Sequence, residues 1–447
     1  MDILVKLSQF LLSLSLLIVL HELGHFIPAK LFKTRVEKFY LFFDVKFSLF
    51  KKKIGDTVYG IGWLPLGGYV KIAGMIDESM DTEQMKQEPQ PWEFRSKPAW
   101  QRLIIMLGGV TVNFVLAFVI YIGMTWYYGD RYIANDSLKD GVWVTSDALQ
   151  NAGMQSGDKI ISIDGEKLER FDQAQAKMLT AKNVVVERNG KEENIQLPVD
   201  FVKGIIDNKG QKFIMPRLPF IVAGFEDTSM NKEVLKERDF IVSINGQEVK
   251  YYDQMEGRLK SLANQSVPAI IERDNQEQTV TLQVNDEGKI GVAPAMISNA
   301  DAEKLGLFTL TTDHHSFAAS IPIGLEKGKD QLVGYGKQLK MIVNPDTGAY
   351  KGVGGFKAIF DVFPNTWSWE VFWSITAFLS IMLGVMNLLP IPASDGGHVM
   401  FLLYEMISGR KPSDKFLEYA QTVGFVLLIA LLLFANGNDI FKAIIGK

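Results

Sequence analysis

Long stretches without a charged side chain are the feature that most limits what this chain can fold into. Residues 103–128 are 26 such residues in a row, and residues 371–394 are 24. About 20 apolar residues in a helix suffice to cross a bilayer. Residues 7–29 and 419–438 form two further apolar runs of that length. The sequence therefore predicts a multi-span α-helical membrane protein with four transmembrane helices.

The first apolar run carries His21, Glu22 and His25 in the pattern H-E-x-x-H. In an α-helix the two histidines lie one turn apart on the same face, so both imidazoles can bind one Zn²⁺ while Glu22 points at a metal-bound water. The pattern also arises by chance on the solvated face of soluble helices. Here residues 7–20 before it are uncharged, and ionisable groups at membrane depth are functional candidates because their burial is costly.

A further acidic group appears where the third apolar run breaks. Residues 387–398 place two prolines and two glycines around Asp395. Non-helical backbone at membrane depth is tolerated only where it is buried in protein or lines a cavity. Asp395 is therefore the natural third ligand, which leaves an open position for water. The alternative is an interfacial aspartate that caps the next helix. The chain has no cysteine, which excludes disulfides and thiolate ligands.

The distribution of basic residues predicts the orientation in the membrane. Residues 30–102 contain 13 Lys or Arg, which places this connection in the cytoplasm and the N-terminus outside. His21 and His25 then lie roughly 8 to 14 Å from the inner end of the first helix, at about 1.5 Å per residue. The third helix runs inward, so Asp395 reaches the same depth. After a short cytoplasmic loop the fourth helix returns the C-terminus outside.

Residues 129–300 have the composition of a soluble region and contain an internal repeat. The segment 156–165, with its G-D-x-I-x-x-I-x-G pattern, corresponds to 237–246. The strand at 185–190 corresponds to that at 270–275, and an alternating strand follows each of them. The sequence thus predicts two similar α+β domains inserted between the second and third helices.

These two inserted domains, at 129–220 and 221–300, resemble the bacterial type of PDZ domain. A PDZ groove takes an extended peptide as an added strand, so peptide tails are one class of partner. The alternative is a pair of spacer domains that only exclude bulky partners. In the second copy Arg238 replaces the turn glycine of the first, which leaves its ligand groove in more doubt than its fold.

The remaining segments are less regular. Residues 58–72 form two short apolar strands about a Pro/Gly-rich turn, which predicts a membrane-associated β-hairpin, with an ordinary surface hairpin as the alternative. The net charge of −4 without a dominant basic stripe indicates no nucleic-acid partner. The predicted segments are the first helix with H-E-x-x-H at 1–30, the cytoplasmic-side loop with the β element at 31–102, the second helix at 103–128, the PDZ-like domains at 129–220 and 221–300, an amphipathic linker on the outer face at 301–370, the third helix with its broken segment at 371–408, a cytoplasmic loop at 409–418, and the fourth helix with the C-terminus at 419–447.

Together these features resemble the site-2 protease family of intramembrane metalloproteases. The likeness covers nearly the whole chain: an early H-E-x-x-H in a membrane helix, a tandem PDZ insertion after the second helix, and a late N-x-x-P-x-x-x-x-D-G motif. The family usually has Leu before the Asp-Gly, whereas Ser394 stands here. That departure concerns local packing and activity.

The resemblance implies a role for each matching residue. His21, His25 and Asp395 would bind one Zn²⁺, Glu22 would be the catalytic base, and Asn387 would hold the substrate backbone. It also implies a multi-pass protein of the bacterial inner membrane, with single-span substrates such as an anti-sigma factor that has already been cut outside. Its membrane-associated β element, which pairs with the unwound substrate, matches Gly67, Gly68, Tyr69 and Val70.

Two hypotheses from other functional classes compete with the protease hypothesis. A non-enzymatic membrane adaptor would collect peptide tails in its PDZ grooves and hold a structural metal. Structural zinc sites, however, are closed by four protein ligands, and this sequence offers three. A metal transporter would need ligands along a path through several helices, and the sequence shows one cluster.

Overall fold

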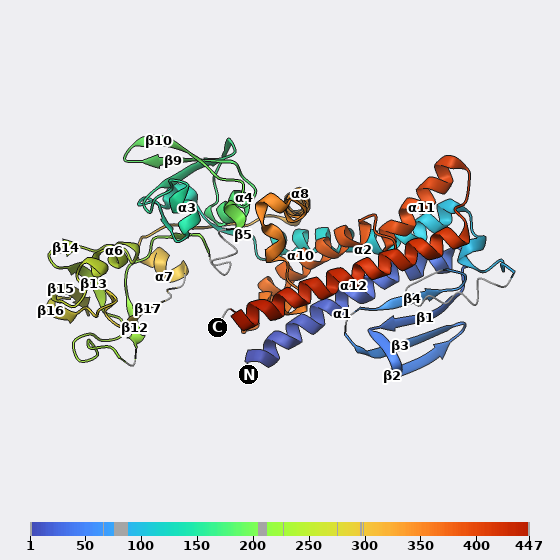
Figure 1. Cartoon of the computed structure of the whole chain (residues 1–447), viewed down its shortest axis with the longest axis horizontal. Helices are drawn as coiled ribbons and strands as arrows, with labels where there is room; N and C mark the ends of the chain where they lie inside the picture. Colours follow the sequence, from blue (N-terminus) through green and yellow to red (C-terminus); the bar gives the residue numbers. More distant parts are fainter. Residues whose placement is uncertain are drawn as a thin grey trace. The chain divides into compact units, whose positions relative to one another are not determined.

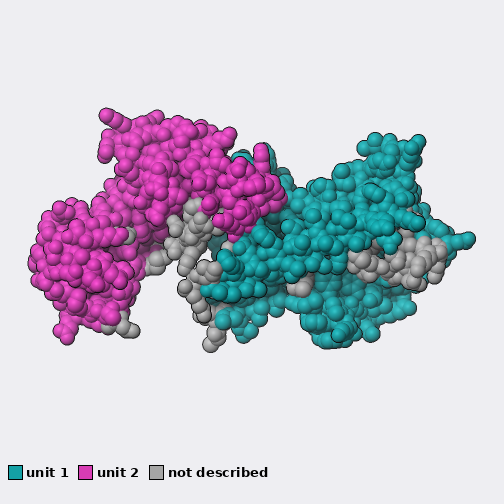
Figure 2. Space-filling model, viewed as in Figure 1, with its two compact units in different colours: residues 1–129, 314–337, 353–447 teal, residues 130–313, 338–352 magenta. Residues whose placement is uncertain are grey.

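The computed structural model describes residues 2–65, 67–75, 88–203, 212–226, 228–274, 276–295, 297 and 299–445. Leu66 of the predicted hairpin turn, residues 76–87 of the predicted cytoplasmic-side loop and Asn275 of the predicted repeat lie outside these residues. The chain divides into two compact units, coloured teal and magenta in Figure 2. Unit 1 consists of Met1–Gly129, His314–Lys337 and Val353–Lys447, and unit 2 consists of Asp130–Asp313 and Gln338–Gly352.

Unit 1 is built on four long apolar helices. They are α1 (Asp2–Leu31), α2 (Ala99–Tyr127), α10 (Trp369–Leu388) and α12 (Asp414–Ile445). Each is long and apolar enough to cross a membrane, so the prediction of a multi-span helical protein is confirmed. In Figure 1 α2 runs alongside α10, and it packs against both α1 and α10. Three further helices outside the sheets are α8 (Phe317–Val343), α9 (Phe356–Val362) and α11 (Asp395–Ser408).

Glycines let α1 and α2 approach one another closely. A methyl group on Gly24 would lie 2.6 Å from the carbonyl carbon of Gly108 and 2.7 Å from the Cα of Gly109, and one on Gly108 would collide with the carbonyl of Gly24. Only residues without a side chain allow two helix backbones to meet in this way. The histidines of α1 are therefore held directly against α2.

The sheet of unit 1 corrects the predicted hairpin at residues 58–72. Its two strands exist as β3 (Thr57–Leu64) and β4 (Tyr69–Ile72), but they are not neighbours. Between them lies β1 (Val36–Leu41), parallel to β3 and antiparallel to β4. With β2 (Phe43–Ile54) the order is β2-β3-β1-β4, so β4 is an edge strand.

The sequence pattern does not predict β1, because charged residues interrupt the apolar pattern of this strand. Glu37 and Lys38 lie in the middle of the strand. Val36 and Tyr40, in contrast, are buried with relative exposures of 0% and 2%. Burial of these two side chains stabilises β1 in the centre of the sheet, where it separates the two strands that were expected to pair.

Unit 2 contains two four-stranded sheets with the same strand order, β8-β7-β9-β10 and β14-β13-β15-β16. Each has its own hydrophobic core. Two short pairs, β6 with β11 and β12 with β17, complete the two lobes. The elements of unit 2 are β5 (Asp130–Ile133), β6 (Val142–Val144), α3 (Asp147–Asn151), β7 (Lys159–Ile163), β8 (Glu166–Lys167), α4 (Ala174–Met178), β9 (Asn183–Arg188), β10 (Lys191–Gln196), β11 (Ile214–Pro216), β12 (Val222–Phe225), β13 (Phe240–Ile244), β14 (Gln247–Glu248), α6 (Asp253–Ser261), β15 (Ser266–Arg273), β16 (Gln276–Gln283), β17 (Val292–Pro294), α7 (Asn299–Lys304) and β18 (Leu310–Asp313).

The two lobes share one buried ion pair at equivalent positions. In the first, Arg188 donates to both carboxylate oxygens of Asp158, each at 2.7 Å. In the second, Arg273 donates to Asp239 at 2.7 and 2.6 Å. Burial alone would raise the pKa of the Asp239 carboxyl, but the hydrogen bonds from Arg273 and from the backbone of Lys236, together with the positive charges of these two residues, hold this pKa below its usual value. Each pair fixes the turn that precedes β7 or β13.

The same turn is strained in the second lobe. Arg238 adopts φ = +72°, where the first lobe has Gly157 at φ = +101°. A non-glycine residue in this region costs about 1 kcal/mol or more. We expect Arg238→Gly to raise the free energy of opening of β13 and β15 by roughly 0.5–1 kcal/mol, since part of the relief is offset by a more flexible unfolded chain. Hydrogen exchange of the full chain measures this.

Asn245→Gly serves as the matched control for that measurement. Asn245 also has a positive φ, +50°, but asparagine tolerates the left-handed region. Its replacement should therefore change the exchange of β13 and β15 less than Arg238→Gly does. If neither variant opens more slowly than the unaltered chain, the turn stores no strain.

Part of the predicted linker at 301–370 belongs to unit 2. Strand β18 pairs antiparallel with β5, and Ala302 of α7 and Phe308 are buried in the core of the first lobe. This pairing joins residues about 180 positions apart, which local pattern does not reveal. The predicted amphipathic linker therefore does not cover residues 301–313, because most of these residues form α7 and β18 of unit 2; α8 and α9 follow in the rest of the segment.

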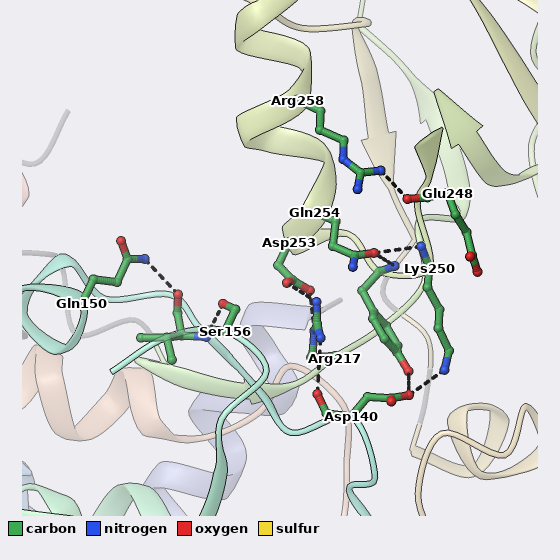
Figure 3. A network of polar contacts seen from close by, with 11 residues as sticks. Asp140, Gln150, Ser156, Arg217, Glu248, Lys250, Asp253, Gln254 and Arg258 are labelled. Atoms are coloured by element: carbon green, nitrogen blue, oxygen red, sulfur yellow. Dashed lines mark hydrogen bonds and ion pairs between the residues drawn. The ribbon is translucent and has the colours of Figure 1, made fainter. Parts of the chain in front are cut away.

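A polar network joins the two lobes of unit 2 (Figure 3). Arg217 donates to Asp253 at 3.0 and 2.7 Å and to the carbonyl of Asp140 at 3.3 Å. The carboxylate of Asp140 accepts from Lys250 at 2.6 Å and from the hydroxyl of Tyr251. These two donors hold the pKa of Asp140 below its usual value. The network ties the segment before β6 to the segment before α6.

Candidate metal centre

Three ionisable side chains converge in unit 1. The Nε2 atoms of His21 and His25 are 3.2 Å apart. The Oδ2 atom of Asp395 lies 3.4 Å from the first and 3.3 Å from the second. Two of these side chains lie one turn apart on α1, and the third comes from residue 395 at the start of α11. The structure thus brings the three predicted ligands together.

The spacing of these three atoms fits a zinc ion. Zinc binds imidazole nitrogen at about 2.0–2.1 Å and carboxylate oxygen at about 2.0–2.2 Å in tetrahedral geometry, so the edges of the tetrahedron measure roughly 3.3–3.5 Å. The three distances above, 3.2, 3.4 and 3.3 Å, lie within about 0.1 Å of this range. Among the described residues, Oδ2 of Asp395 is buried and has no hydrogen-bond donor, as expected of an oxygen whose partner is a cation. Three ligands leave the fourth position open.

Local chain geometry delivers Asp395 to this place. Helix α10 ends at Leu388, and α11 begins at Asp395. Between them Ala393 has φ = +78°, an uncommon conformation for a residue with a side chain. Ser394 points its hydroxyl at the carbonyls of Leu389 and Ile391, at 3.1 and 2.8 Å. The hydroxyl of Ser394 therefore donates hydrogen bonds to carbonyls of the broken segment. Leucine has no hydroxyl and cannot make these bonds.

The two glycines after Asp395 allow the broken segment to fold back over the first turn of α11. A methyl group on Gly396 would collide with the carbonyl of Leu389, and one on Gly397 with that of Ile391. The backbone around residues 389–397 is thus packed without space for side chains. The glycines that follow Asp395 are therefore needed for this packing, in addition to the aspartate that is the predicted ligand.

Glu22, the predicted catalytic base, lies between the metal centre and β4. Val70 on this edge strand contributes a backbone hydrogen bond to its carboxylate. Gly68 makes the approach possible, since a methyl group there would collide with Ile18 and lie 3.4 Å from Cγ of Glu22. The edge of the sheet is therefore directed at the side of α1 that carries Glu22.

A cavity of about 510 Å³ connects these groups, a size typical of ligand sites. Its lining includes Glu22 and the three predicted ligands. Of the predicted substrate-binding residues, Gly68, Tyr69, Val70 and Asn387 line it, whereas Gly67 is not among the lining residues. The amide nitrogen of Asn387 lies 3.3 Å from Nε2 of His21. The cavity is apolar over much of its surface, with Met106, Met386, Ile391 and Leu428 among its lining residues.

Tyr69 is fixed rather than mobile in this lining. Its ring stacks on those of Tyr40 and Phe43, with centroids 5.4 and 6.1 Å away. Its hydroxyl donates to Asp44 at 2.8 Å and accepts from Lys38 at 3.2 Å. A rigid aromatic side chain at the start of β4 keeps the edge strand in one position beside Glu22.

In α2 the residues Gly108, Gly109 and Asn113 predict close helix packing and an interhelical hydrogen bond, but the sequence does not predict their contact with the metal centre. His25 contacts the backbone carbonyl of Ile105 through Nδ1 at 2.8 Å, and His21 contacts the amide of Asn113 through Nδ1 at 3.1 Å. Gly109 lies between them, and a methyl group there would collide with both rings. The only signal in the sequence is an Asn and a Gly-Gly pair in an uncharged helix, which equally predicts helix packing.

Comparisons with known proteins place nearly the whole length of the chain among zinc metalloproteases. The model of peptidase family M50 matches residues 9–431. A Campylobacter jejuni protein named "Putative zinc metalloprotease Cj1068" is 28% identical over 436 residues, which cover 98% of this chain and 93% of that protein. A Haemophilus influenzae protein named "Regulator of sigma E protease" is 27% identical over 469 residues, covering 99% of this chain and 100% of that protein.

Proposed function

The chain belongs to peptidase family M50 and is a zinc metalloprotease of membranes, and on that premise we propose which residues perform the reaction and on what substrates. His21, His25 and Asp395 hold the zinc ion, and Glu22 is the catalytic base. Three ligand atoms at tetrahedral spacing beside Glu22, in a cavity bordered by an edge strand, support this assignment above all.

The chemistry divides between the ion and the protein. When bound, zinc lowers the pKa of a water molecule toward about 7 and polarises the scissile carbonyl. Glu22 takes the proton of that water and returns it to the nitrogen of the leaving amine. Asn387, which also lines the cavity, holds the substrate backbone by its amide. The apolar lining excludes bulk water, so that the water at the reacting bond is the one that Glu22 contacts.

The substrates are transmembrane segments of single-span membrane proteins. A transmembrane helix satisfies its own backbone hydrogen bonds, so it must unwind before its carbonyls are accessible. The edge strand β4, with Tyr69 and Val70 in the cavity wall and Gly68 directly before it, offers backbone groups that can pair with the unwound segment as an added strand. Because one relative is named a regulator of sigma E protease, an anti-sigma factor already cut outside is the substrate we propose.

Exposed apolar side chains support the membrane association of the sheet. On β2, Val45, Phe47, Leu49 and Phe50 have relative exposures of 50–66%. Lysines 51–53 follow them directly. An apolar strand next to a basic cluster fits the inner surface of a membrane, which carries anionic lipids. The inner membrane, with residues 30–102 and the active site toward the cytoplasm and both termini outside, is therefore the location and orientation we propose.

The two lobes of unit 2 are proposed to be PDZ-like domains on the outer side. Their equal strand orders and equivalent Asp–Arg pairs support a duplicated domain. The network around Asp140 holds the two lobes together, as a size filter requires. We propose that they exclude substrates that retain bulky external domains, with binding of peptide tails as the second role.

The family match argues against the two other classes. An adaptor with a structural metal needs four ligands, and the cluster found within the described residues has three. A transporter needs several sites along a path, and this cluster is the one metal-binding group found in the described part of the chain. Neither a fourth ligand nor a second site is found among the described residues, so hydrolysis explains the site better.

Substrate unwinding gives a direct test of the proposed function. We expect a single-span substrate with Gly or Pro in its membrane segment to be cut about tenfold faster or more than the same substrate with Leu there, because Gly and Pro lower helix stability by about 1 and 3 kcal/mol per residue. Cleavage of both substrates by the zinc-loaded full chain in lipid measures this. Equal rates would contradict the unwinding step, and no cleavage of either would contradict the substrate class.

A further inference from the structure

One stripe of α2 contacts both histidines of the metal centre. Ile105, Gly109 and Asn113 follow each other at intervals of four residues and therefore lie on the same face of the helix. The carbonyl of Ile105 meets His25, Asn113 meets His21, and Gly109 leaves room for the two rings. This stripe belongs to no part of the H-E-x-x-H or N-x-x-P-x-x-x-x-D-G motifs.

At His25 the stripe determines which nitrogen carries the proton. Nδ1 lies 2.8 Å from the carbonyl oxygen of Ile105. A carbonyl can only accept a hydrogen bond, so Nδ1 must donate, and Nε2 of the neutral ring is bare. Metal-binding histidines commonly donate their second N–H to such a partner, which fixes both tautomer and ring orientation.

At His21 the group that can accept a hydrogen bond from Nδ1 is the side chain of Asn113. Its amide nitrogen lies 3.1 Å from Nδ1 of His21, while its Oδ1 is buried without a hydrogen-bond partner among the described residues. If the amide donates, the ring proton must be on Nε2, where it would oppose metal binding. A half-turn of the amide exchanges the two atoms, and Oδ1 then accepts from Nδ1. That orientation gives the oxygen a partner and leaves Nε2 bare.

The position of Asn113 is itself fixed. The residue is fully buried, and the hydroxyl of Ser380 on α10 donates to its backbone carbonyl at 2.7 Å. A buried amide is costly unless it is hydrogen-bonded. Its side chain is thus held at one distance from the ring of His21 by contacts to two helices.

We propose that Asn113 is a positioning residue of the zinc site: its side-chain oxygen accepts the Nδ1 proton of His21 and keeps Nε2 bare for the metal. The inference rests on the proposed zinc site. It extends that site from the three ligands to α2, which supplies one hydrogen-bond acceptor to each histidine. Loss of such a partner typically lowers metal affinity by about 10–100-fold.

Zinc affinity of the full chain in detergent, measured by competition with a chelator, tests this proposal. We expect Asn113→Leu, which cannot accept a hydrogen bond, to raise the Kd for zinc by about 10–100-fold. Asn113→Asp keeps an acceptor of the same shape and should stay within about threefold of the unaltered chain. The visible spectrum of bound Co²⁺ should follow the same order, since it reports ligand geometry directly.

Ser13→Ala is the matched control. Ser13 and Thr376 form a buried hydrogen bond of 2.9 Å between α1 and α10, away from the cavity. Removing it costs a similar hydrogen bond between membrane helices but should leave zinc affinity unchanged. A loss in Ser13→Ala equal to that in Asn113→Leu would show that helix packing, and not the ring of His21, is what Asn113 supports.

The remaining outcomes separate this inference from the proposed function. Unaltered zinc affinity in Asn113→Leu would overturn the role of Asn113. Loss in Asn113→Asp equal to that in Asn113→Leu would overturn the acceptor assignment. Should Asn113→Leu not fold, Asn113→Ala carries the same comparison with Asn113→Asp. An unaltered chain that binds no zinc would instead overturn the site of His21, His25 and Asp395.

Discussion

Replacing Glu22 by Gln should lower the rate of substrate cleavage on the order of 10³-fold, the usual range for loss of a general base, and leave zinc bound. Gln has the shape of Glu and keeps an oxygen for the hydrogen bond from Val70, but it cannot take a proton. Zinc should be retained because Glu22 is not one of the three converging ligands. Metal analysis and a cleavage assay on the same preparation measure both effects.

Glu418→Gln provides the control for this variant. Glu418 is exposed on α12 and is not among the residues that line the cavity. Its replacement removes one carboxylate without touching the reaction, so cleavage should be unchanged. If Glu22→Gln cut substrate at the normal rate, Glu22 would not be the base. If it lost zinc together with activity, Glu22 would instead hold the metal.

The second large effect is expected from a single methyl group at a position that lies outside both sequence motifs. In Gly109→Ala the new Cβ would collide with Nε2 of His25 and lie 2.6 Å from Cε1 of His21. Both rings must move away from their present positions. We expect zinc affinity to fall by roughly 100-fold, at the upper end of effects from residues behind a ligand. Chelator competition on the full chain measures the Kd.

Gly123→Ala tests whether the effect is specific. Gly123 lies on the same helix α2, and a methyl group there meets no atom within 4 Å. Alanine in a helix interior is about 0.5–1 kcal/mol more stable than glycine, so this variant should bind zinc normally and be slightly more stable. Equal zinc affinity in the two variants would mean that the rings have space to move, and that α2 does not define the site.

The two effects differ in how far the sequence could predict them. Glu22 follows from the local pattern, because the spacing of H-E-x-x-H fixes which residues share a helix face. The Gly108-Gly109 pair predicts close helix packing, but no local pattern predicts that Gly109 lies against the two histidines. Its role depends on the closeness of α1 and α2, which results from the contact of Gly24 with Gly108. A methyl group at residue 109 is expected to lower the zinc affinity only because α1 and α2 pack closely together.

The sheet of unit 1 shows a similar limit. The apolar strands at 57–64 and 69–72 could be recognised, but their pairing could not. Register and order in a sheet depend on which side chains are buried against other segments. Here Val36 and Tyr40 bring β1 between the two strands. As a result β4 is an edge strand beside Glu22, a position on which the proposed substrate binding depends.

By itself the sequence determined what depends on composition and short spacing. The lengths of the uncharged runs indicated four membrane helices, the pattern at residues 21–25 placed two histidines on one face, and the broken run pointed to Asp395. Each of these is a property of residues close in the chain. The sequence similarity of the two inserted domains is likewise visible without coordinates.

The tertiary structure alone decided how those residues meet. It brought an aspartate 370 positions after His25 within 3.3 Å of that ring, and it placed Asn113 and the carbonyl of Ile105 behind the two imidazoles. It also joined β18 to β5. The physical reason is the same in each case: these contacts are made by the burial of distant segments against one another, and burial energy depends on the whole packing and not on the local order of residues.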